Sequence, residues 1–357
     1  MIKILHGADL HLDSAFAGRS EAATARLRRE LRSIPEKVTA LCKEESCDLL
    51  LLAGDLFDGS YTKESYMALK NALEEVGIPT FISPGNHDFC APDSPWLTEA
   101  WPRNVHIFKN PWVESVALSE LDCRIYGAGF SSMDCGALLE NFKTEEQERY
   151  HIGLFHGDPM QSNSPYNPIS YAQVAASGLD YLALGHVHKA GSFTAGHTLC
   201  AWPGCAMGRG FDELEEKGVL LVSVEDELLT RFVPLDTPRF CDWEAEVLTS
   251  PEEAVAARLP AAGNENFYRI TLTGECEKPD LAELYRCFSS FRNLELRDRT
   301  RPAVDIWGAA GADSLEGVYF QMLHTLFEEG DQRSRRIALL AAKLSRKIMD
   351  GNEVVLP

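Results

Sequence analysis

The chain has 357 residues, of which 45% are hydrophobic and 25% are charged. At roughly 100–200 residues per domain this length suggests two domains, and the balance excludes disordered and small disulfide-stapled classes. The 34 basic and 54 acidic residues give a net charge of −20, which opposes long-range attraction to nucleic acid and to anionic membranes.

Features that report on the cellular compartment favour the cytoplasm. No apolar run approaches the roughly 20 residues of a membrane-spanning helix, so we expect no membrane partner. The N-terminus reaches Gly7-Ala8-Asp9 too soon to hold the apolar part of a signal peptide. The ten cysteines include no Cys-x-x-Cys pair, and we interpret them as reduced, mostly buried thiols.

Short apolar runs alternate with helical patterns along the first part of the chain. Buried strands are predicted at 2–8, 49–53 and 79–83, and helical periodicity covers 26–42 and 66–76. Five more strands are predicted at 124–128, 151–155, 181–184, 218–224 and 229–233. This order predicts an α/β (α+β) domain over residues 1–237, with two sheets flanked by helices.

The pattern changes after residue 237. Residues 240–296 read as strand, helix, strand, helix and strand, which predicts a compact β-α-β-α-β domain within 238–302. Residues 303–357 form a predicted helical tail, in which Asp313-Ser314-Leu315-Glu316 has the form of a capping box. The first tail helix is expected to stop at Gly330, and a second to cover 331–349.

Residue types that bind metals follow several of the predicted strands. In α/β sheets, ligands bind at the carboxyl ends of the strands, so we expect these residues to meet in one cleft. They occur in five groups, each after an apolar run: Asp9 with His11, Asp55 with Asp58, Asn86 with His87, His156, and His186 with His188.

This set favours a hydrolase that uses two metal ions. Residues i and i+2 of an extended segment share a face, so Asp9 with His11, and His186 with His188, are each expected to point into one site. Imidazole and carboxylate ligands suit Mn²⁺, Fe or Zn²⁺. Two ions need a bridging carboxylate, for which the aspartate after Gly54 is suited, and together they clamp a phosphoryl group and activate a bridging water.

The five groups, in this order, resemble the calcineurin-like metallophosphoesterases, and within them the SbcD/YhaO-type DNA repair exonucleases. Three further segments carry the resemblance to the YhaO branch: 8–14 (ADLHLDS), 183–189 (ALGHVHK) and the loop from Pro203 to Gly210. The predicted β-α-β-α-β unit is similar to the capping domain of that family. The resemblance implies a two-sheet metallophosphoesterase sandwich with this cap.

The resemblance also implies two divalent ions, of which Mn²⁺ is expected, and their ligands. One ion is then held by Asp9, His11, Asp55 and His188, and the other by Asp55, Asn86, His156 and His186. Asp55 bridges the two ions in this scheme. His87, next to a ligand in the sequence, faces the scissile phosphate.

One position departs from the better-studied nucleases of this type. They often have His directly after Gly-Asp-Leu-Phe, where this chain has Asp58. In the wider family, an Asp at this spacing pairs with the His of Gly-Asn-His, which implies that Asp58 couples to His87. A neighbouring carboxylate favours imidazolium, so we expect a raised pKa for His87 and catalytic roles for both residues. The alternative is that Asp58 caps a helix that begins near Tyr61.

Three functions are weighed against one another. The resemblance favours a metal-dependent DNA exonuclease, the nuclease subunit of a DNA repair complex. The alternative is a phosphodiesterase or phosphatase that acts on small nucleotides or other phosphoesters. A non-catalytic scaffold is disfavoured because all seven ligands are present. Given the net charge, we expect weak DNA binding by the isolated chain, even with local positive charge from Arg26, Arg28, Arg29 and Arg32.

The tail indicates a protein partner. At 100° per residue, five apolar residues of the second tail helix fall on one stripe: Ile337, Leu340, Ala341, Leu344 and Ile348. The resemblance implies that this helix docks on the coiled coil of an ABC-type ATPase. The alternative is a surface helix packed on its own cap, and homodimer formation stays open.

Overall fold

The structure, a computed structural model, describes residues 1–17, 19, 21–144, 148–214, 216–225, 227–302 and 306–351. It divides into two compact units. The first comprises residues 1–242 together with 263–269 and 292–295, and the second comprises the rest. The domain boundaries after residues 237 and 302 stay predictions. Among the described residues, no helix combines the length and the apolarity that crossing a membrane would require.

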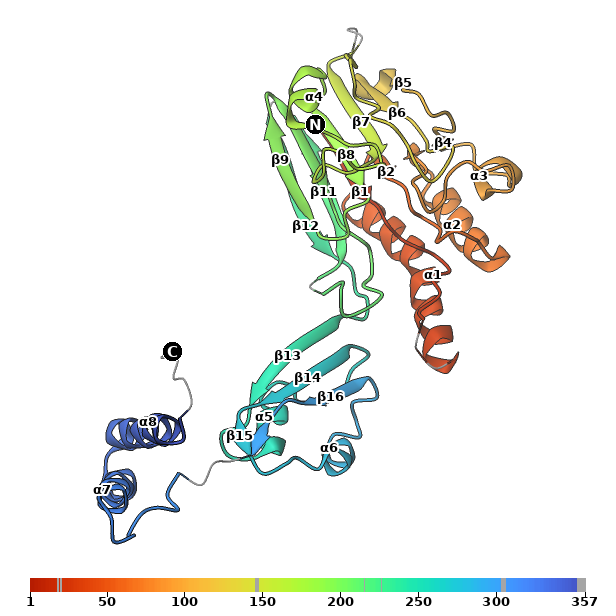
Figure 1. The fold of residues 1–357 in the computed structure, drawn as a ribbon. Coiled ribbons are helices and arrows are strands. Elements are labelled where there is room, and N and C mark those ends of the chain that lie inside the picture. The colour runs from red at the N-terminus through yellow and green to blue at the C-terminus, as the bar shows by residue number, and fades with distance from the viewer. Residues whose placement is uncertain are drawn as a thin grey trace. The chain divides into compact units, whose positions relative to one another are not determined.

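Two six-stranded sheets form the first unit (Figure 1), as the sequence predicts. The first has the order β12-β11-β1-β2-β3-β4. Its strands are β1 (Ile2–Gly7), β2 (Leu49–Leu52), β3 (Thr80–Ile82), β4 (Val105–Ile107), β11 (Gly218–Val224) and β12 (Leu228–Pro234). Strands β1 to β4 are parallel, whereas β11 pairs antiparallel with both β1 and β12.

The second sheet has the order β5-β6-β7-β8-β10-β9. Its strands are β5 (Glu114–Leu118), β6 (Cys123–Gly127), β7 (Tyr150–His156), β8 (Tyr181–Gly185), β9 (Gly191–Ala195) and β10 (Thr198–Trp202). The four central strands are parallel, and β5 and β9 pair antiparallel at the two edges. The helical elements of this unit are α1 (Glu21–Glu44), α2 (Lys63–Val76), α3 (Pro95–Thr98), α4 (Tyr171–Ala176) and the 3₁₀ turn η1 (Ser119–Leu121).

The alternation of side chains along the strands creates the layers. In β2, Leu49 and Leu51 face the second sheet and join one buried cluster with residues of β6 and β7, such as Ile152. Leu50 and Leu52 face the other way and pack against the apolar side of α1 and α2. On the outer face of the second sheet, Val174 of α4 completes a third cluster. Since both faces of the central strands are covered, strands such as β2 and β8 are apolar throughout.

The β-α-β-α-β prediction after residue 237 is also confirmed. The elements are β13 (Phe240–Glu246), α5 (Pro251–Ala256), β14 (Phe267–Thr273), α6 (Leu281–Cys287) and β16 (Leu294–Asp298), with β15 (Glu275–Cys276) and β17 (Arg301–Pro302) as a short extra pair. The three main strands form a sheet of order β13-β14-β16. Ser250 and Asp280 cap the two helices through their side-chain oxygens.

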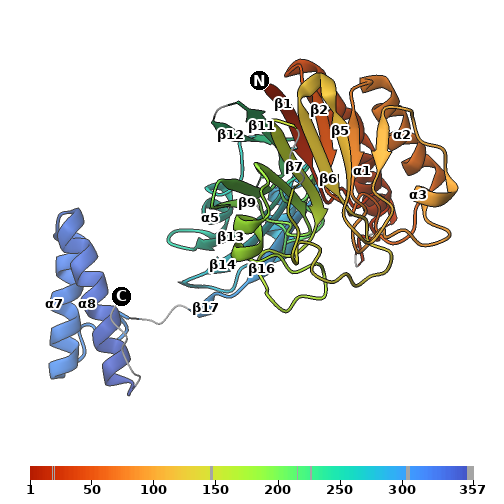
Figure 2. The ribbon, with the colours of Figure 1, turned by 90° about the horizontal axis from the view of Figure 1, so that it is seen from above.

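The tail consists of α7 (Leu315–Glu329) and α8 (Gln332–Met349), which lie side by side in both views (Figures 1 and 2). The predicted capping box at the start of α7 is wrong, because only the hydrogen bond from the N-cap side chain forms and the reciprocal one does not. Ser314 is the N-cap and accepts a hydrogen bond from the backbone N–H of Gly317. The third helical position is therefore this glycine and not Glu316, so no side chain reaches back to the N-cap N–H.

Candidate metal centre

The candidate ligands lie just beyond the carboxyl ends of parallel strands. Strands β1, β2 and β3 lead to the segments that hold Asp9, Asp55 and Asn86. In the second sheet, β7 ends at His156, and β8 leads to His186 and then His188. Residues from distant parts of the chain therefore meet where the carboxyl ends of the parallel strands of the two sheets come together.

The ligand residues lie in turns and not in extended strands, and these turns set the directions of their side chains. Asp9, His11, Asp55 and His186 have positive φ values of 52°, 46°, 51° and 100°. The expectation that residues i and i+2 share a face of an extended segment is therefore wrong here, although the side chains do converge. Backbone hydrogen bonds fix these turns, since the N–H groups of Asp9 and His11 donate to the carbonyls of Gly54 and Asp55 at 3.0 and 2.9 Å.

Two glycines keep the centre open. A Cβ atom on Gly85 would lie 2.3 Å from Asp55 Oδ1, and one on Gly54 would lie 2.6 Å from His156 Nδ1. Gly54 also has a φ of 83°, which favours glycine. The glycines in the Gly-Asp and Gly-Asn-His motifs are thus needed for close packing of the ligands.

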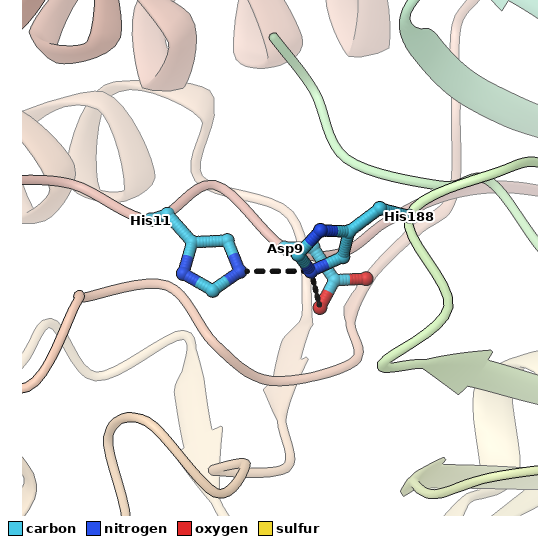
Figure 3. Close-up of side chains that lie close together, drawn as sticks. All are labelled: Asp9, His11 and His188. Carbon is cyan, nitrogen blue, oxygen red and sulfur yellow. Dashed lines mark hydrogen bonds and ion pairs between the residues drawn. The ribbon is translucent and has the colours of Figure 1, made fainter. Parts of the chain in front are cut away.

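The first ligand group contains Asp9, His11 and His188 (Figure 3). The Nε2 atoms of His11 and His188 are 3.1 Å apart, and His188 Nε2 lies 4.0 Å from Asp9 Oδ1. Asp55 Oδ2 lies 3.9 Å from His11 Nε2. These four residues are the set expected for one ion, and the structure brings them together.

The second group lies on the other side of Asp55. Its Oδ2 is 3.4 Å from His156 Nε2. Asn86 Oδ1 lies 2.9 Å from His156 Nε2 and 3.2 Å from His186 Nδ1. His156 Nδ1 lies 2.9 Å from the carbonyl of Ala53, which fixes Nδ1 as the protonated nitrogen and leaves Nε2 to act as a ligand.

Asp58 lies beside both His87 and the first ligand group. Its Oδ1 is 2.9 Å from His87 Nδ1 and 3.3 Å from His11 Nδ1. Ser14 donates its hydroxyl to Asp58 Oδ2 at 2.7 Å. The alternative in which Asp58 caps the following helix is wrong, because Thr62 is the N-cap of α2.

The pKa values around this carboxylate shift in opposite directions. Burial would raise the pKa of Asp58, but hydrogen bonds from His11, His87 and Ser14 outweigh it and place the pKa below its usual range. The same hydrogen bond to Asp58 raises the pKa of His87 above the value of a free histidine. The His87 side chain is 45% exposed, so its imidazole reaches solvent beside the ligands.

Comparison with known proteins agrees with this geometry. The family model described as calcineurin-like phosphoesterase matches residues 2–190. The chain belongs to the calcineurin-like phosphoesterase family. It is therefore a hydrolase that acts on phosphoesters, and the five groups of ligand residues all fall within the matched range.

Several individual proteins are also similar to this phosphoesterase. The metallophosphoesterase YhaO of Bacillus subtilis is 34% identical over 236 residues, which cover 62% of this chain and 57% of YhaO. The chain therefore matches less than two thirds of that relative. The SbcD component of the nuclease SbcCD from Staphylococcus epidermidis is 24% identical over 76% of this chain and 79% of its own length. Among solved structures, TT1561 of Thermus thermophilus gives a TM-score of 0.39 at 14% identity, covering 65% of this chain and 98% of that one.

The residues of the phosphoesterase fit a divalent metal. Asp9, His11, Asp55 and His156 are almost fully buried. Two imidazole nitrogens that face each other at 3.1 Å, with carboxylate oxygens close by, form a donor set that a cation satisfies. Burial raises the pKa of the neighbouring Cys205 thiol to about 12, so this cysteine stays protonated and is a poor ligand at neutral pH.

Three residues that support the ligands were not predicted as site residues. Glu213 Oε1 lies 2.7 Å from His188 Nδ1 and orients that ring, and Arg209 pairs with the same carboxylate. The buried Asp88 accepts hydrogen bonds from the backbone N–H groups of Leu56 and Gly85, each at 2.7 Å. The Gly-Asn-His-Asp motif contains Asp88, but only the fold shows that Glu213 and Arg209 reach His188.

Proposed function

We propose that this phosphoesterase is a two-metal phosphodiesterase that removes nucleotides from DNA ends as the nuclease subunit of a repair complex. The observation that carries the metal chemistry is the position of Asp55 Oδ2, which lies 3.9 Å from His11 and 3.4 Å from His156, between the two ligand groups. Choice of DNA as the substrate is supported by the relatives named as nuclease subunits, which match beyond residue 190.

In this proposal, seven residues hold two divalent ions, with Mn²⁺ the expected metal. Asp9, His11, Asp55 and His188 bind one, and Asp55, Asn86, His156 and His186 bind the other. When bound, the metal pair supplies Lewis acidity and a water of lowered pKa. The buried carboxylates and the tight turns fix the ligand positions, so little reorganisation is needed when substrate arrives.

His87 and Asp58 act on the leaving group. Asp58 holds the Nδ1–H of His87, which orients the ring and leaves Nε2 to donate a proton to the departing oxygen. Ser14 fixes the other oxygen of Asp58, so the carboxylate cannot turn away from the histidine. The chain thus places a proton donor next to the metal centre without using either residue as a ligand.

An assay with Mn²⁺ and three substrate classes tests the proposal. We expect turnover of end-labelled DNA and of a simple chromogenic diester by the same protein, and no turnover of either by Asp55→Asn. Hydrolysis of cyclic nucleotides with inert DNA would instead favour a small-molecule phosphodiesterase.

Binding of DNA by the chain alone is expected to be weak. Three of the four arginines near the start of α1 already have partners: Arg26 pairs with Glu265 at 2.7 Å, Arg28 donates to the carbonyl of Ser14, and Arg32 lies 3.9 Å from Asp13. With a net charge of −20, we expect a Kd for duplex DNA of roughly 10⁻⁴–10⁻⁶ M at physiological salt. A Kd for duplex DNA below about 1 nM, as in tight sequence-specific complexes, would contradict this expectation.

The tail is the proposed docking site for a coiled-coil ATPase of the ABC type. Helix α8 packs against α7 through the small residues Ala338 and Ala342. Much of the predicted stripe remains uncovered, since Ile337, Leu340 and Ile348 are 53%, 47% and 62% exposed. An apolar helix face next to basic side chains suits a groove between acidic helices.

We also propose a cytoplasmic location. All ten cysteines are free, and Cys42 and Cys47 stay unlinked although the backbone N–H of Cys47 donates to the carbonyl of Cys42. Free thiols in this number are typical of a reducing compartment.

A further inference from the structure

Arg209 lies beside the first ligand group, between Glu213 and Asp58. It belongs to the segment that connects β10 to β11. Its Nε donates to Glu213 Oε2 at 3.3 Å and its Nη2 to Glu213 Oε1 at 2.7 Å, so the guanidinium and the carboxylate form a two-pronged pair. Nη2 also lies 3.1 Å from His188 Nδ1. One side of the guanidinium is thereby committed to the residues that support a ligand.

The remaining nitrogen, Nη1, faces Asp58 on the opposite side of the guanidinium. Its contact there is with Asp58 Oδ2 at 3.9 Å, which is too long for a hydrogen bond. Within the described ranges no residue accepts a hydrogen bond from Nη1, and the side chain is 22% exposed. Asp58 therefore has His87 against one oxygen and Arg209 beside the other, so both side chains lie next to the same carboxylate.

The charges around the metal centre suggest what Nη1 of Arg209 could bind. The centre gathers the buried carboxylates of Asp9, Asp55 and Asp88, with Asp58 and Glu213 beside them. Among the lysines and arginines that the structure describes, Arg209 is the one whose side chain pairs with a carboxylate of this centre. Its guanidinium stays charged at every relevant pH and presents donors in a plane that matches phosphate oxygens.

We propose that Arg209 binds the phosphoryl group of the substrate, with Nη1 donating to a nonbridging oxygen while Glu213 holds the rest of the guanidinium in place. This inference rests on the proposed function, because it assigns a residue that selects anionic phosphoesters at the same centre. The pair with Glu213 removes the freedom of the long side chain before substrate arrives, so little entropy is lost on binding.

Binding of inorganic phosphate to the Mn²⁺-loaded protein tests the assignment. Calorimetry gives the Kd for phosphate, and metal analysis and melting temperature are measured on the same samples. The variants are Arg209→Gln, which removes the charge, and Arg209→Lys, which keeps the charge but loses the planar fork. The control is Arg124→Gln, because Arg124 forms the same two-pronged pair with Glu148, at 2.8 and 2.9 Å, near the amino end of β6.

We expect Arg209→Gln to weaken phosphate binding by about 10-fold to 100-fold, in line with loss of a hydrogen bond to a charged group, with the metal content unchanged. Arg209→Lys should bind phosphate more tightly than the glutamine variant and less tightly than the original chain, so the proposal stays testable if Arg209→Gln fails to fold. Arg124→Gln should leave the Kd within about twofold.

Two results would overturn the inference. Unchanged phosphate binding in both Arg209 variants would mean that Nη1 does not contact the anion. Loss of metal, with normal phosphate binding restored by excess Mn²⁺, would make Arg209 only a positioning residue for His188. Phosphate binding that depends on Arg209 in a protein that cuts no DNA would support this inference while the nuclease assignment fails.

Discussion

In the first unit, which holds the metal centre, most large apolar side chains are covered by the chain itself, whereas along α7 and α8 many of them face solvent. Leu27, Leu31 and Trp96 have no measurable exposure. By contrast, Leu315 is 89% exposed and Met322 is 69% exposed, and the hairpin shares only a small cluster around Ile306, Phe320 and Ala342. The two regions therefore differ in how far their large apolar side chains are buried.

The difference separates a region whose apolar side chains pack within the chain from one that would need another protein to cover them. Each proposed ligand in the domain is held by backbone or side-chain contacts within the same chain, as with Asp55 and the turn glycines. The tail instead leaves much of one apolar face exposed, at Ile337, Leu340 and Ile348. Chemistry should therefore be a property of the domain alone, and binding to another protein a property of the tail. The following experiments test this separation, beginning with the largest expected effect.

Replacement of the bridging aspartate should abolish the chemistry. Asp55→Asn removes the charge shared by both ligand groups, so we expect loss of bound metal and a fall in kcat of at least about 10⁴-fold. Metal analysis and diester hydrolysis provide the measurements. Full metal content and near-normal kcat in this variant would show that Asp55 does not bridge.

Loss of either member of the Asp58–His87 pair should lower kcat while both metals stay bound. We expect falls of about 10²–10⁴-fold for His87→Ala and for Asp58→Asn, and an effect of the double variant far smaller than the product of the two. An unchanged kcat in Asp58→Asn, with only a lower melting temperature, would assign Asp58 a purely structural role.

The same pair predicts a pH dependence. Asp58 raises the pKa of His87, so the protonated ring persists to higher pH, and activity is lost as pH rises through that pKa. In Asp58→Asn this alkaline loss should move to lower pH. A pH–rate profile of the two proteins is the measurement, and coincident profiles would contradict the coupling.

Metal binding should compete with a proton. Burial alone would lower the pKa of His156, but the carboxylates of Asp55 and Asp9 outweigh it and raise the pKa to about 9. Metal binding must displace this proton, so affinity should rise by about tenfold per pH unit at neutral pH. Calorimetry in buffers of different ionisation enthalpy counts the protons released. If metal binding released no proton, the raised pKa of His156 would be contradicted.

Removal of the tail should have the smallest effect on chemistry. Deletion of residues 313–357 should leave diester hydrolysis within about twofold, because none of the proposed site residues lies there. The same deletion should abolish co-purification with the ATPase partner. Ile337→Asp, at an exposed position of α8, is a milder test, with Gln332→Ser, at an exposed uncharged position of the same helix, as the control. Loss of diester activity with an unfolded domain would contradict the separation.

The strong periodic elements of the fold could be predicted from the sequence. The strand at 218–224 has the predicted bounds, and most other predicted strands agree within two residues. Apolar runs behind each ligand group are clear because both faces of the central strands are buried. The strands β4, β5, β9 and β10 were not predicted. They are three to five residues long, and β4, β5 and β9 are partly exposed, so their apolar pattern is weak.

The identity of the site was easier to predict than its geometry. The residue types and their order indicated the seven ligand candidates, and the structure gathers them around Asp55. Their conformation was not predictable from strand alternation, because positive φ values at Asp9 and His11 depend on hydrogen bonds to the next turn. Glu213 was missed for a similar reason, since only the fold brings residues 188 and 213 together.

The position of β1 in its sheet affects how the chain folds during synthesis. This strand pairs on one side with β2, which follows soon after it, and on the other with β11, where Ile2 lies opposite Val224. During synthesis, the strand that leads to Asp9 is available long before its second neighbour exists. Until then it has an open apolar edge, a known route to aggregation. A shortened chain that ends at residue 190 would keep every proposed ligand and yet require a substitute for β11 to remain in solution.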